Sequence, residues 1–208
     1  MTHCFSRRSF LKGSAAAAAV LSSPLLPADA AFSEAENGLF SPVSALCQTQ
    51  YGPVKGREGE NGQLSWYGIP YGAAPTGESR WTAPQEPARW HTVRDCTSPA
   101  PAAYQYTTFP LGTEDCLTLD IYSSAEAKKR PVLVYLHGSA ATGSSLELPG
   151  CELVRDAGCV FVALNYRLGL FGWNCLPALT ADPDVTGNFA LLDIARALDW
   201  VRDNIRRF

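Results

Sequence analysis

Two uninterrupted apolar runs dominate the hydrophobic pattern of this chain, one over residues 131–136 and one over residues 159–164. Such runs are typical of strands that are buried on both faces, as in a parallel sheet. Residues 148–157 lie between them and predict a short helix that ends at Gly158. The order strand, helix, strand predicts two parallel neighbours in a sheet with helices on both faces, which is the α/β class of fold.

A longer helix is predicted over residues 188–207, after a loop rich in Gly and Pro at residues 169–187. Its apolar residues recur at helical spacing, so the helix should have one buried stripe. The stripe consists of Leu191, Ile194, Leu198, Val201 and Ile205.

Short strands are predicted earlier in the chain. Residues 43–49, 54–57 and 63–67 each have a strand pattern, and Asn61-Gly62 is a hairpin signal between the last two. We expect these three to form a small antiparallel sheet. Residues 117–122 alternate between apolar and polar positions and predict a further strand.

The segment at residues 68–95 holds too many Pro and Gly residues for regular structure. Aromatic residues in and beside it can each bury a large area. They are Trp66, Tyr67, Tyr71, Trp81 and Trp90. We therefore expect a packed irregular loop, not a flexible linker, and no domain boundary at this point.

The first apolar run ends at His137-Gly138, and the small residues Ser139, Ala140 and Ala141 follow it. A strand that ends in small residues leaves backbone N–H groups free at the carboxyl edge of the sheet, where open α/β sheets bind ligands. Such amides can stabilise an oxyanion. The alternative is a buried strand followed by a flexible turn, and both interpretations fit this stretch taken alone.

Composition changes this picture mainly by exclusion. The 208 residues are 46% hydrophobic and 18% charged, with a net charge of −3, so no large basic surface for a nucleic acid is implied. Seven cysteines without a CxxC pair, and only three histidines, give little support to a zinc site. We expect no metal, no cofactor and, after residue 31, no membrane-spanning segment.

The first 30 residues have the features of an export signal. Arg7-Arg8 is followed by a weakly apolar stretch at residues 15–26 and then by Ala28-Asp29-Ala30. This order resembles a bacterial twin-arginine signal, which carries folded proteins across the inner membrane. The alternative is an alanine-rich tail with a chance arginine pair. We expect cleavage after Ala30 and a periplasmic or extracellular domain of residues 31–208, whose six cysteines could form disulfides.

Five segments, taken together and in order, resemble one family. They are Gly68-Ile69-Pro70-Tyr71-Gly72 with Arg80-Trp81, then Glu114 to Tyr122, Pro131 to Gly138, Asn165 to Gly169, and Gly187-Asn188 through Asn204-Ile205. They are similar to segments of type-B carboxylesterases, the α/β-hydrolases that include para-nitrobenzyl esterases and cholinesterases. The resemblance covers residues 43–208. It implies the N-terminal part of an α/β-hydrolase fold, in which a small antiparallel sheet leads into a mostly parallel central sheet. It also implies hydrolysis of small-molecule carboxylic esters through an acyl-serine.

In this family a glycine-rich loop after a His or Tyr supplies two oxyanion N–H groups. The resemblance assigns them to Ser139 and Ala140, with His137 and Gly138 as supporting residues. The family usually has glycine at both donor positions. A left-handed backbone at Ser or Ala would cost about 1 kcal/mol, and their Cβ atoms would narrow the space beside the acyl carbon. His137 as a catalytic base is the alternative to a buried residue that shapes the loop.

The resemblance also implies two structural ion pairs, the alternative being four solvated charges. The pairs are Arg80 with Glu114 and Arg167 with Asp193. The family has a disulfide at the position of Cys116, but its usual upstream partner is absent here. Cys96 lies nearby and could replace that partner; otherwise both are buried free thiols.

The family's nucleophile is a serine in a G-x-S-x-G elbow, served by a histidine and an acid. The 208 residues contain no G-x-S-x-G, and the family places its triad after the helix at 188–207. We therefore expect a chain that ends early, a sheet with an open apolar edge, and no esterase activity of this product alone. The alternatives are a non-catalytic cholinesterase-like binding protein and a fragment from a frameshift or an incomplete gene model.

Overall fold

The computed structural model describes residues 44–126, 129–179 and 187–208, and its main feature is a five-stranded sheet in the order β3-β4-β8-β10-β9. These strands are Arg57–Glu58 (β3), Gln63–Pro70 (β4), Thr118–Ser124 (β8), Val160–Leu164 (β10) and Val132–Leu136 (β9). β9 and β10 are parallel and are connected through helix α2, Gly150–Ala157. The predicted strand–helix–strand unit is confirmed. The remaining neighbours in the sheet pair antiparallel, so the described sheet is mixed.

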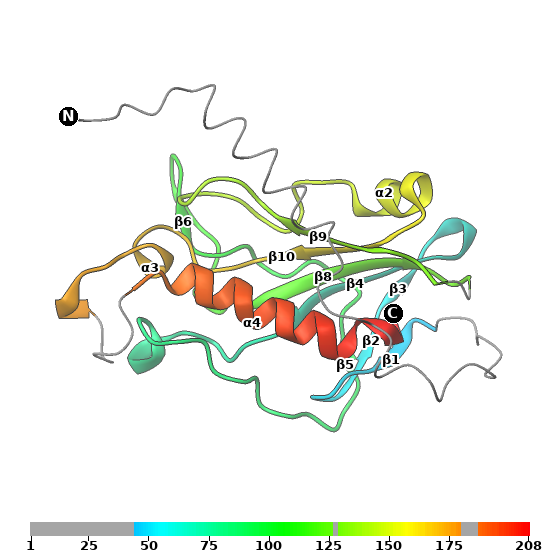
Figure 1. Ribbon diagram of the computed structural model, residues 1–208, viewed down its shortest axis with the longest axis horizontal. Helices are drawn as coiled ribbons and strands as arrows, with labels where there is room; N and C mark the ends of the chain where they lie inside the picture. Colours follow the sequence, from blue (N-terminus) through cyan, green and yellow to red (C-terminus); the bar gives the residue numbers. More distant parts are fainter. Residues whose placement is uncertain (1–43, 127–128, 180–186) are drawn as a thin grey trace, which may run out of the picture. The chain divides into compact units, whose positions relative to one another are not determined.

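Helices cover both faces of this sheet (Figure 1), α2 on one side and α4, Phe189–Asn204, on the other. Every residue of β10 is buried, and its side chains alternate between two apolar clusters. Phe161 and Ala163 pack with α2, whereas Val162 and Leu164 pack in the larger cluster with α4. A short helix η5, Ile205–Arg207, follows α4. None of the described helices is long and apolar enough to cross a membrane.

The prediction that residues 131–136 are buried on both faces is wrong for the described residues. β9 is an edge strand that pairs only with β10. Val132, Leu133 and Leu136 are 41%, 47% and 43% exposed. An apolar run indicates that burial of the strand is favourable, but it does not identify the segment that would bury it. Among the described residues no further strand pairs with β9, which agrees with the expected open apolar edge.

The buried face of α4 also differs from the predicted stripe. Leu191 and Leu198 are 53% and 44% exposed. Of the other stripe residues, Val201 is buried, and Ile194 and Ile205 are partly buried against the core. The helix also buries Phe189, Ala190, Asp193, Ala197, Trp200 and Asn204. Two of these residues are polar, and both have hydrogen-bond partners that make burial tolerable. Asn204, for example, accepts from the amide of Gln50 at 2.8 Å and donates to the Trp200 carbonyl at 2.8 Å.

The N-terminal strands form a small sheet in the order β1-β2-β5, from Leu46–Gln48, Pro53–Lys55 and Arg94–Asp95. β1 and β2 are antiparallel as expected, whereas β5 is parallel to β2. The prediction that residues 63–67 complete this sheet is wrong, because β4 joins the central sheet beside β8. Its residue Trp66 is fully buried and packs edge-on against Phe208 at 4.9 Å.

The predicted hairpin at Asn61-Gly62 is confirmed. It connects β3 to β4, and both residues have a positive φ, 56° and 71°, as such turns require. The remaining elements are short. They are η2 (Glu60–Gly62), η3 (Gly77–Ser79), the hairpin of β6 (Gln105–Tyr106) and β7 (Pro110–Leu111), α3 (Gly169–Gly172) and η4 (Pro177–Leu179). The predicted export signal and its cleavage site lie outside the described residues.

Candidate functional site

The candidate site is the loop of residues 137–145, which leaves the sheet at the carboxyl end of β9. Leu136 of β9 is opposite Leu164 of the parallel strand β10. The segment of residues 165–169 therefore starts at the same sheet edge as this 137–145 loop. Ligands of open α/β sheets bind at such an edge.

His137 is a packing residue in this loop. Its side chain is buried and stacks on Tyr166, with ring centroids 4.2 Å apart. Gly143 also lies against this ring, and a Cβ atom at position 143 would overlap Nδ1 of His137. Burial lowers the pKa of His137, and its Nε2 has no hydrogen-bond partner within the described residues. A neutral, enclosed imidazole shapes the loop but is badly placed to act as a base.

Ser139 and Ala140 have backbone amides without a hydrogen-bond partner among the described residues. Both residues are exposed, and within the described part of the chain neither N–H donates a hydrogen bond. Ser139 has a φ of 74°, in the left-handed region. The amides of the next two residues are different, because Ala141 and Thr142 donate to the Ser139 hydroxyl at 3.2 and 3.3 Å. The amides of Ser139 and Ala140, like that of Gly138, are therefore free donors within the described residues, and they are followed by two satisfied ones.

One neighbouring segment fastens this loop at three places. The Tyr166 hydroxyl donates to the His137 carbonyl at 2.6 Å. The Gly169 amide donates to the Ala140 carbonyl at 2.7 Å. The side-chain oxygen of Asn165 accepts from the Ser145 amide at 2.9 Å. Residues 165–169 thus hold both ends and the middle of the 137–145 loop.

A second support comes from the β6–β7 hairpin. The buried Gln105 side chain accepts from the Gly143 amide at 3.0 Å and donates to the Gly143 carbonyl at 2.9 Å. It also donates to the Ala103 carbonyl at 3.1 Å. The Gln105 side chain thus satisfies both backbone groups of Gly143 and fixes the loop three residues after Ala140.

A third support is the carboxyl group of Asp120, in the middle of β8. It accepts from the Ser145 hydroxyl at 2.7 Å and from the Gly68 amide at 2.8 Å. Asp120 is only 1% exposed, and this burial raises its pKa, whereas the two hydrogen bonds act to lower it. The end of the loop is therefore bonded directly to the central sheet.

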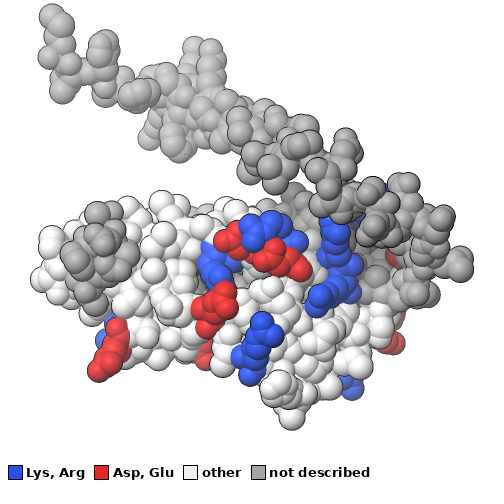
Figure 2. Space-filling view, turned by 60° about the horizontal axis from the view of Figure 1, so that its bottom comes forward, with Lys and Arg blue, Asp and Glu red and all other residues white. Residues whose placement is uncertain are grey.

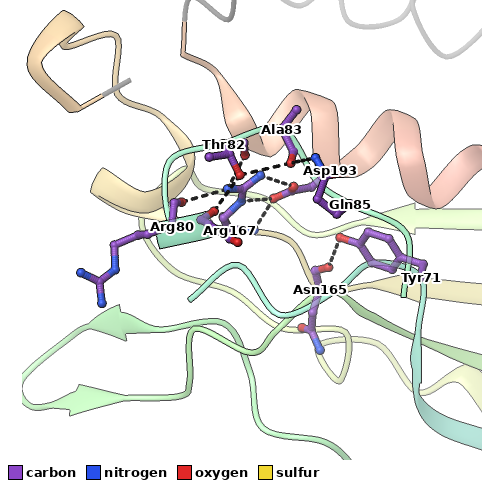
Figure 3. A network of polar contacts seen from close by, with 9 residues as sticks. Tyr71, Arg80, Thr82, Ala83, Gln85, Asn165, Arg167 and Asp193 are labelled. Carbon is purple, nitrogen blue, oxygen red and sulfur yellow. Dashed lines mark hydrogen bonds and ion pairs between the residues drawn. The ribbon is translucent and has the colours of Figure 1, made fainter. Parts of the chain in front are cut away.

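Beneath the 165–169 segment lies a buried ion pair. Asp193 of α4 accepts from the backbone amide, Nε and Nη2 of Arg167 at 3.1, 2.8 and 2.6 Å. Arg167 also donates to the carbonyls of Arg80 and Thr82 at 3.0 and 2.9 Å. Figure 3 shows this guanidinium between the segment that holds Arg80 and Thr82 and Asp193 of α4. Burial raises the pKa of Asp193, and the bonds from Arg167 oppose that shift.

The second expected ion pair is present closer to the surface. Arg80 and Glu114 form two hydrogen bonds, of 2.5 and 2.8 Å. The guanidinium of Arg80 points away from Arg167, although its carbonyl belongs to that network (Figure 3). The proposed bridge between Cys96 and Cys116 is not formed, and both are buried free thiols in the structure. Burial raises the pKa of Cys96 to about 11 and that of Cys116 further.

The supports of the loop were missed by sequence reasoning. Gln105 lies 38 positions before Gly143 and carries no local signal. Asp120 stands at a polar position of the alternating pattern at residues 117–122, which predicts exposure, yet it is buried. A carboxylate at such a position is buried only if it has partners.

Other chemistry has less support. Among the described residues, no three His, Cys, Asp or Glu side chains gather so as to hold a metal ion. On the face drawn in Figure 2, basic and acidic side chains of the described residues are interspersed, and neither sign forms a continuous patch.

Comparison with known proteins matches both parts of the chain. The model described as "Carboxylesterase family" matches residues 43–208. The model of the twin-arginine translocation pathway signal sequence matches residues 4–23. The chain thus carries a twin-arginine export signal, which directs it to the periplasm or the cell exterior.

Individual relatives are esterases. The para-nitrobenzyl esterase of Bacillus subtilis (strain 168) is 40% identical over 175 residues, which cover 78% of this chain and 35% of that protein. The fumonisin B1 esterase of Sphingopyxis macrogoltabida is 36% identical, over 77% of this chain and 32% of its own length. The solved carboxylesterase EST55 of Geobacillus stearothermophilus superposes with a TM-score of 0.72 at 37% identity, over 79% of this chain and 35% of that one. This chain therefore spans about one third of the length of these proteins.

Proposed function

Since this chain belongs to the carboxylesterase family, we propose that its residues 43–208 form the oxyanion-binding part of a serine carboxylic ester hydrolase. The observation that supports this most is that the amides of the exposed residues Ser139 and Ala140 donate no hydrogen bond within the described part of the chain. They lie at the carboxyl end of a parallel strand pair. The surrounding loop is held in one conformation by contacts from residues 165–169, Gln105 and Asp120.

The proposed chemistry is acyl transfer through a serine. A serine hydroxyl gives its proton to a general base and attacks the ester carbonyl carbon. The carbonyl oxygen gains negative charge, and the Ser139 and Ala140 amides donate hydrogen bonds to it. The ester C–O bond then breaks, the alcohol leaves with the proton from the base, and water hydrolyses the acyl-serine. Loss of one such donor typically slows the chemical step by about 10²- to 10³-fold. His137 and Gly138 would support the loop without touching the reacting atoms. The Cβ atoms at 139 and 140 would favour small acyl groups over bulky ones.

The attacking serine is not supplied by these 208 residues, because no G-x-S-x-G elbow occurs in them. We therefore propose that the mature chain, taken as residues 31–208, does not turn over esters by itself. An assay of the purified chain on p-nitrophenyl acetate against a buffer blank tests this. Saturable turnover that a serine-directed organophosphate abolishes would contradict it.

A chimera tests the oxyanion role directly. Residues 43–208 would replace the matching segment of the Bacillus subtilis para-nitrobenzyl esterase, which is 40% identical. We expect the chimera to hydrolyse p-nitrophenyl acetate, and the same chimera with Ala140→Pro, which lacks one amide donor, to lose at least about 100-fold in kcat. Ala74→Pro in a loop away from the site is the control. A folded chimera that binds an organophosphate but does not hydrolyse esters would refute the proposal.

A further inference from the structure

Ser139 combines an unfavourable backbone with an unusual set of hydrogen bonds. Three described residues other than glycine have a positive φ, and the other two, Asn61 and Asn188, are asparagines. Asparagine tolerates the left-handed region well, whereas serine does so poorly. A serine at φ 74° therefore needs a compensating interaction.

That interaction is made by the Ser139 hydroxyl. Its oxygen accepts from the amides of Ala141 and Thr142 at 3.2 and 3.3 Å, and the Thr142 hydroxyl lies 3.4 Å away. A hydroxyl oxygen has two lone pairs, so the two amides account for both. The other supports of the loop act on the carbonyls of His137 and Ala140, on Gly143 and on Ser145. In the described structure, only Ser139 engages the amides of residues 141 and 142.

We infer that Ser139 is a positioning residue of the oxyanion loop. Its hydroxyl caps the second half of the turn, so that the amides of residues 139 and 140 are left as the donors for a negatively charged oxygen. A glycine at this position would permit the same backbone but could not hold it. The inference rests on the proposed function. It assigns to the Ser139 hydroxyl the stabilisation of the turn, which the left-handed backbone alone does not provide.

Variants at this position separate backbone strain from capping. Ser139→Ala removes the cap and keeps the strain, whereas Ser139→Gly removes both. Ser139→Asn tolerates the left-handed backbone and restores a side-chain acceptor, so it should rescue the turn. Ser144→Ala is a matched control in the same loop, because the Ser144 hydroxyl accepts only from the Leu146 amide, at 3.0 Å, among the described residues.

The first readout is amide hydrogen exchange by NMR on the mature chain. We expect Ser139→Ala and Ser139→Gly to accelerate exchange at residues 141 and 142 by roughly three- to tenfold, the loss of one net hydrogen bond. Ser139→Asn should restore the original rates, and Ser144→Ala should change Leu146 alone. Unchanged rates at 141 and 142 in Ser139→Gly would overturn the inference, even if Ser139→Ala proves too unstable to measure.

The second readout is acetate binding, followed at the amides of residues 139 and 140. Ser139→Ala should weaken it by roughly three- to tenfold, and Ser139→Asn should restore it. If acetate shifts these amides in the wild type and equally in Ser139→Ala, the positioning role fails while the proposed function survives. If acetate shifts neither amide in the wild type, the proposed function fails and the inference falls with it.

Discussion

The ion pair between Arg167 and Asp193 gives the largest stability effect that the structure predicts. Their side chains are only 2% and 0% exposed. Asp193→Asn removes the charge and turns an amide N–H₂ group toward the guanidinium, which is itself a donor. Breaking a buried pair in this way costs about 3–5 kcal/mol, because the remaining charge stays buried without compensation. For a domain of this size, that lowers Tm by roughly 6–20 °C.

The same helix offers a control. Asp199 pairs with Arg202 at 2.7 Å, but both side chains are more than half exposed, at 54% and 65%. Asp199→Asn should therefore cost about 0–1 kcal/mol. Urea unfolding followed by circular dichroism measures both variants, with unchanged m-values as the check that the comparison is valid. Equal effects of Asp193→Asn and Asp199→Asn would refute the reasoning.

A double variant adds a further test of this ion pair. Arg167→Met with Asp193→Leu leaves no buried charge, so it should cost less than the two single changes summed. The carbonyls of Arg80 and Thr82 lose their donors in that variant. Some destabilisation should therefore remain. A double variant as unstable as the sum would show that the pair is not coupled.

Three further changes test the supports of the 137–145 loop. Burial raises the pKa of Asp120, so the folded chain keeps a proton that the unfolded chain loses above about pH 4. As the pH rises above that value, the unfolding free energy of the wild type should fall relative to that of Asp120→Asn. A difference between the two that does not change with pH would contradict this prediction. Burial lowers the pKa of His137, so its ring should titrate in NMR below the usual value of about 6.5. The unfolding free energy should fall as the pH drops below that value, because the unfolded chain then binds a proton that the folded chain does not. A titration midpoint above about 6.5 would contradict the packing of His137. Gln105→Ala leaves both backbone groups of Gly143 without a partner and should lower the unfolding free energy, measured in urea, by about 1–3 kcal/mol. Gln85→Ala is the control and should change it little, because the Gln85 side chain donates its hydrogen bond at the surface.

The sequence predicted the parallel pair at the centre of this fold because its signal is local. The apolar run at residues 159–164 is the buried strand β10, and Gly158, with a φ of 62°, ends α2 as expected. The run at residues 131–136 looked the same but lies at the sheet edge. The exposure of each strand depends on which segments lie beside it. The hydrophobic pattern of the strand itself does not predict those neighbours.

The loop of the proposed site could be located from the sequence, but the side chains that support it could not, and its oxyanion role stays a prediction. Small residues after the apolar run indicated free amides in this loop, whereas their assignment to Ser139 and Ala140 and the two ion pairs followed from the resemblance. The predicted α4 stripe is wrong at the exposed Leu191 and Leu198. It also missed the buried Asp193, whose partner Arg167 lies 26 positions away, because the hydrophobic period does not record a pairing over that distance. The same holds for Gln105 and Gly143.

The most direct test of the account is a ¹H–¹⁵N NMR titration of the mature chain with sodium acetate, against sodium chloride at equal ionic strength. The proposed oxyanion donors predict saturable downfield shifts at the amides of Ser139 and Ala140, with little change at Ala141 and Thr142. Shifts that are absent, that never saturate, or that fall equally on all four amides would contradict it.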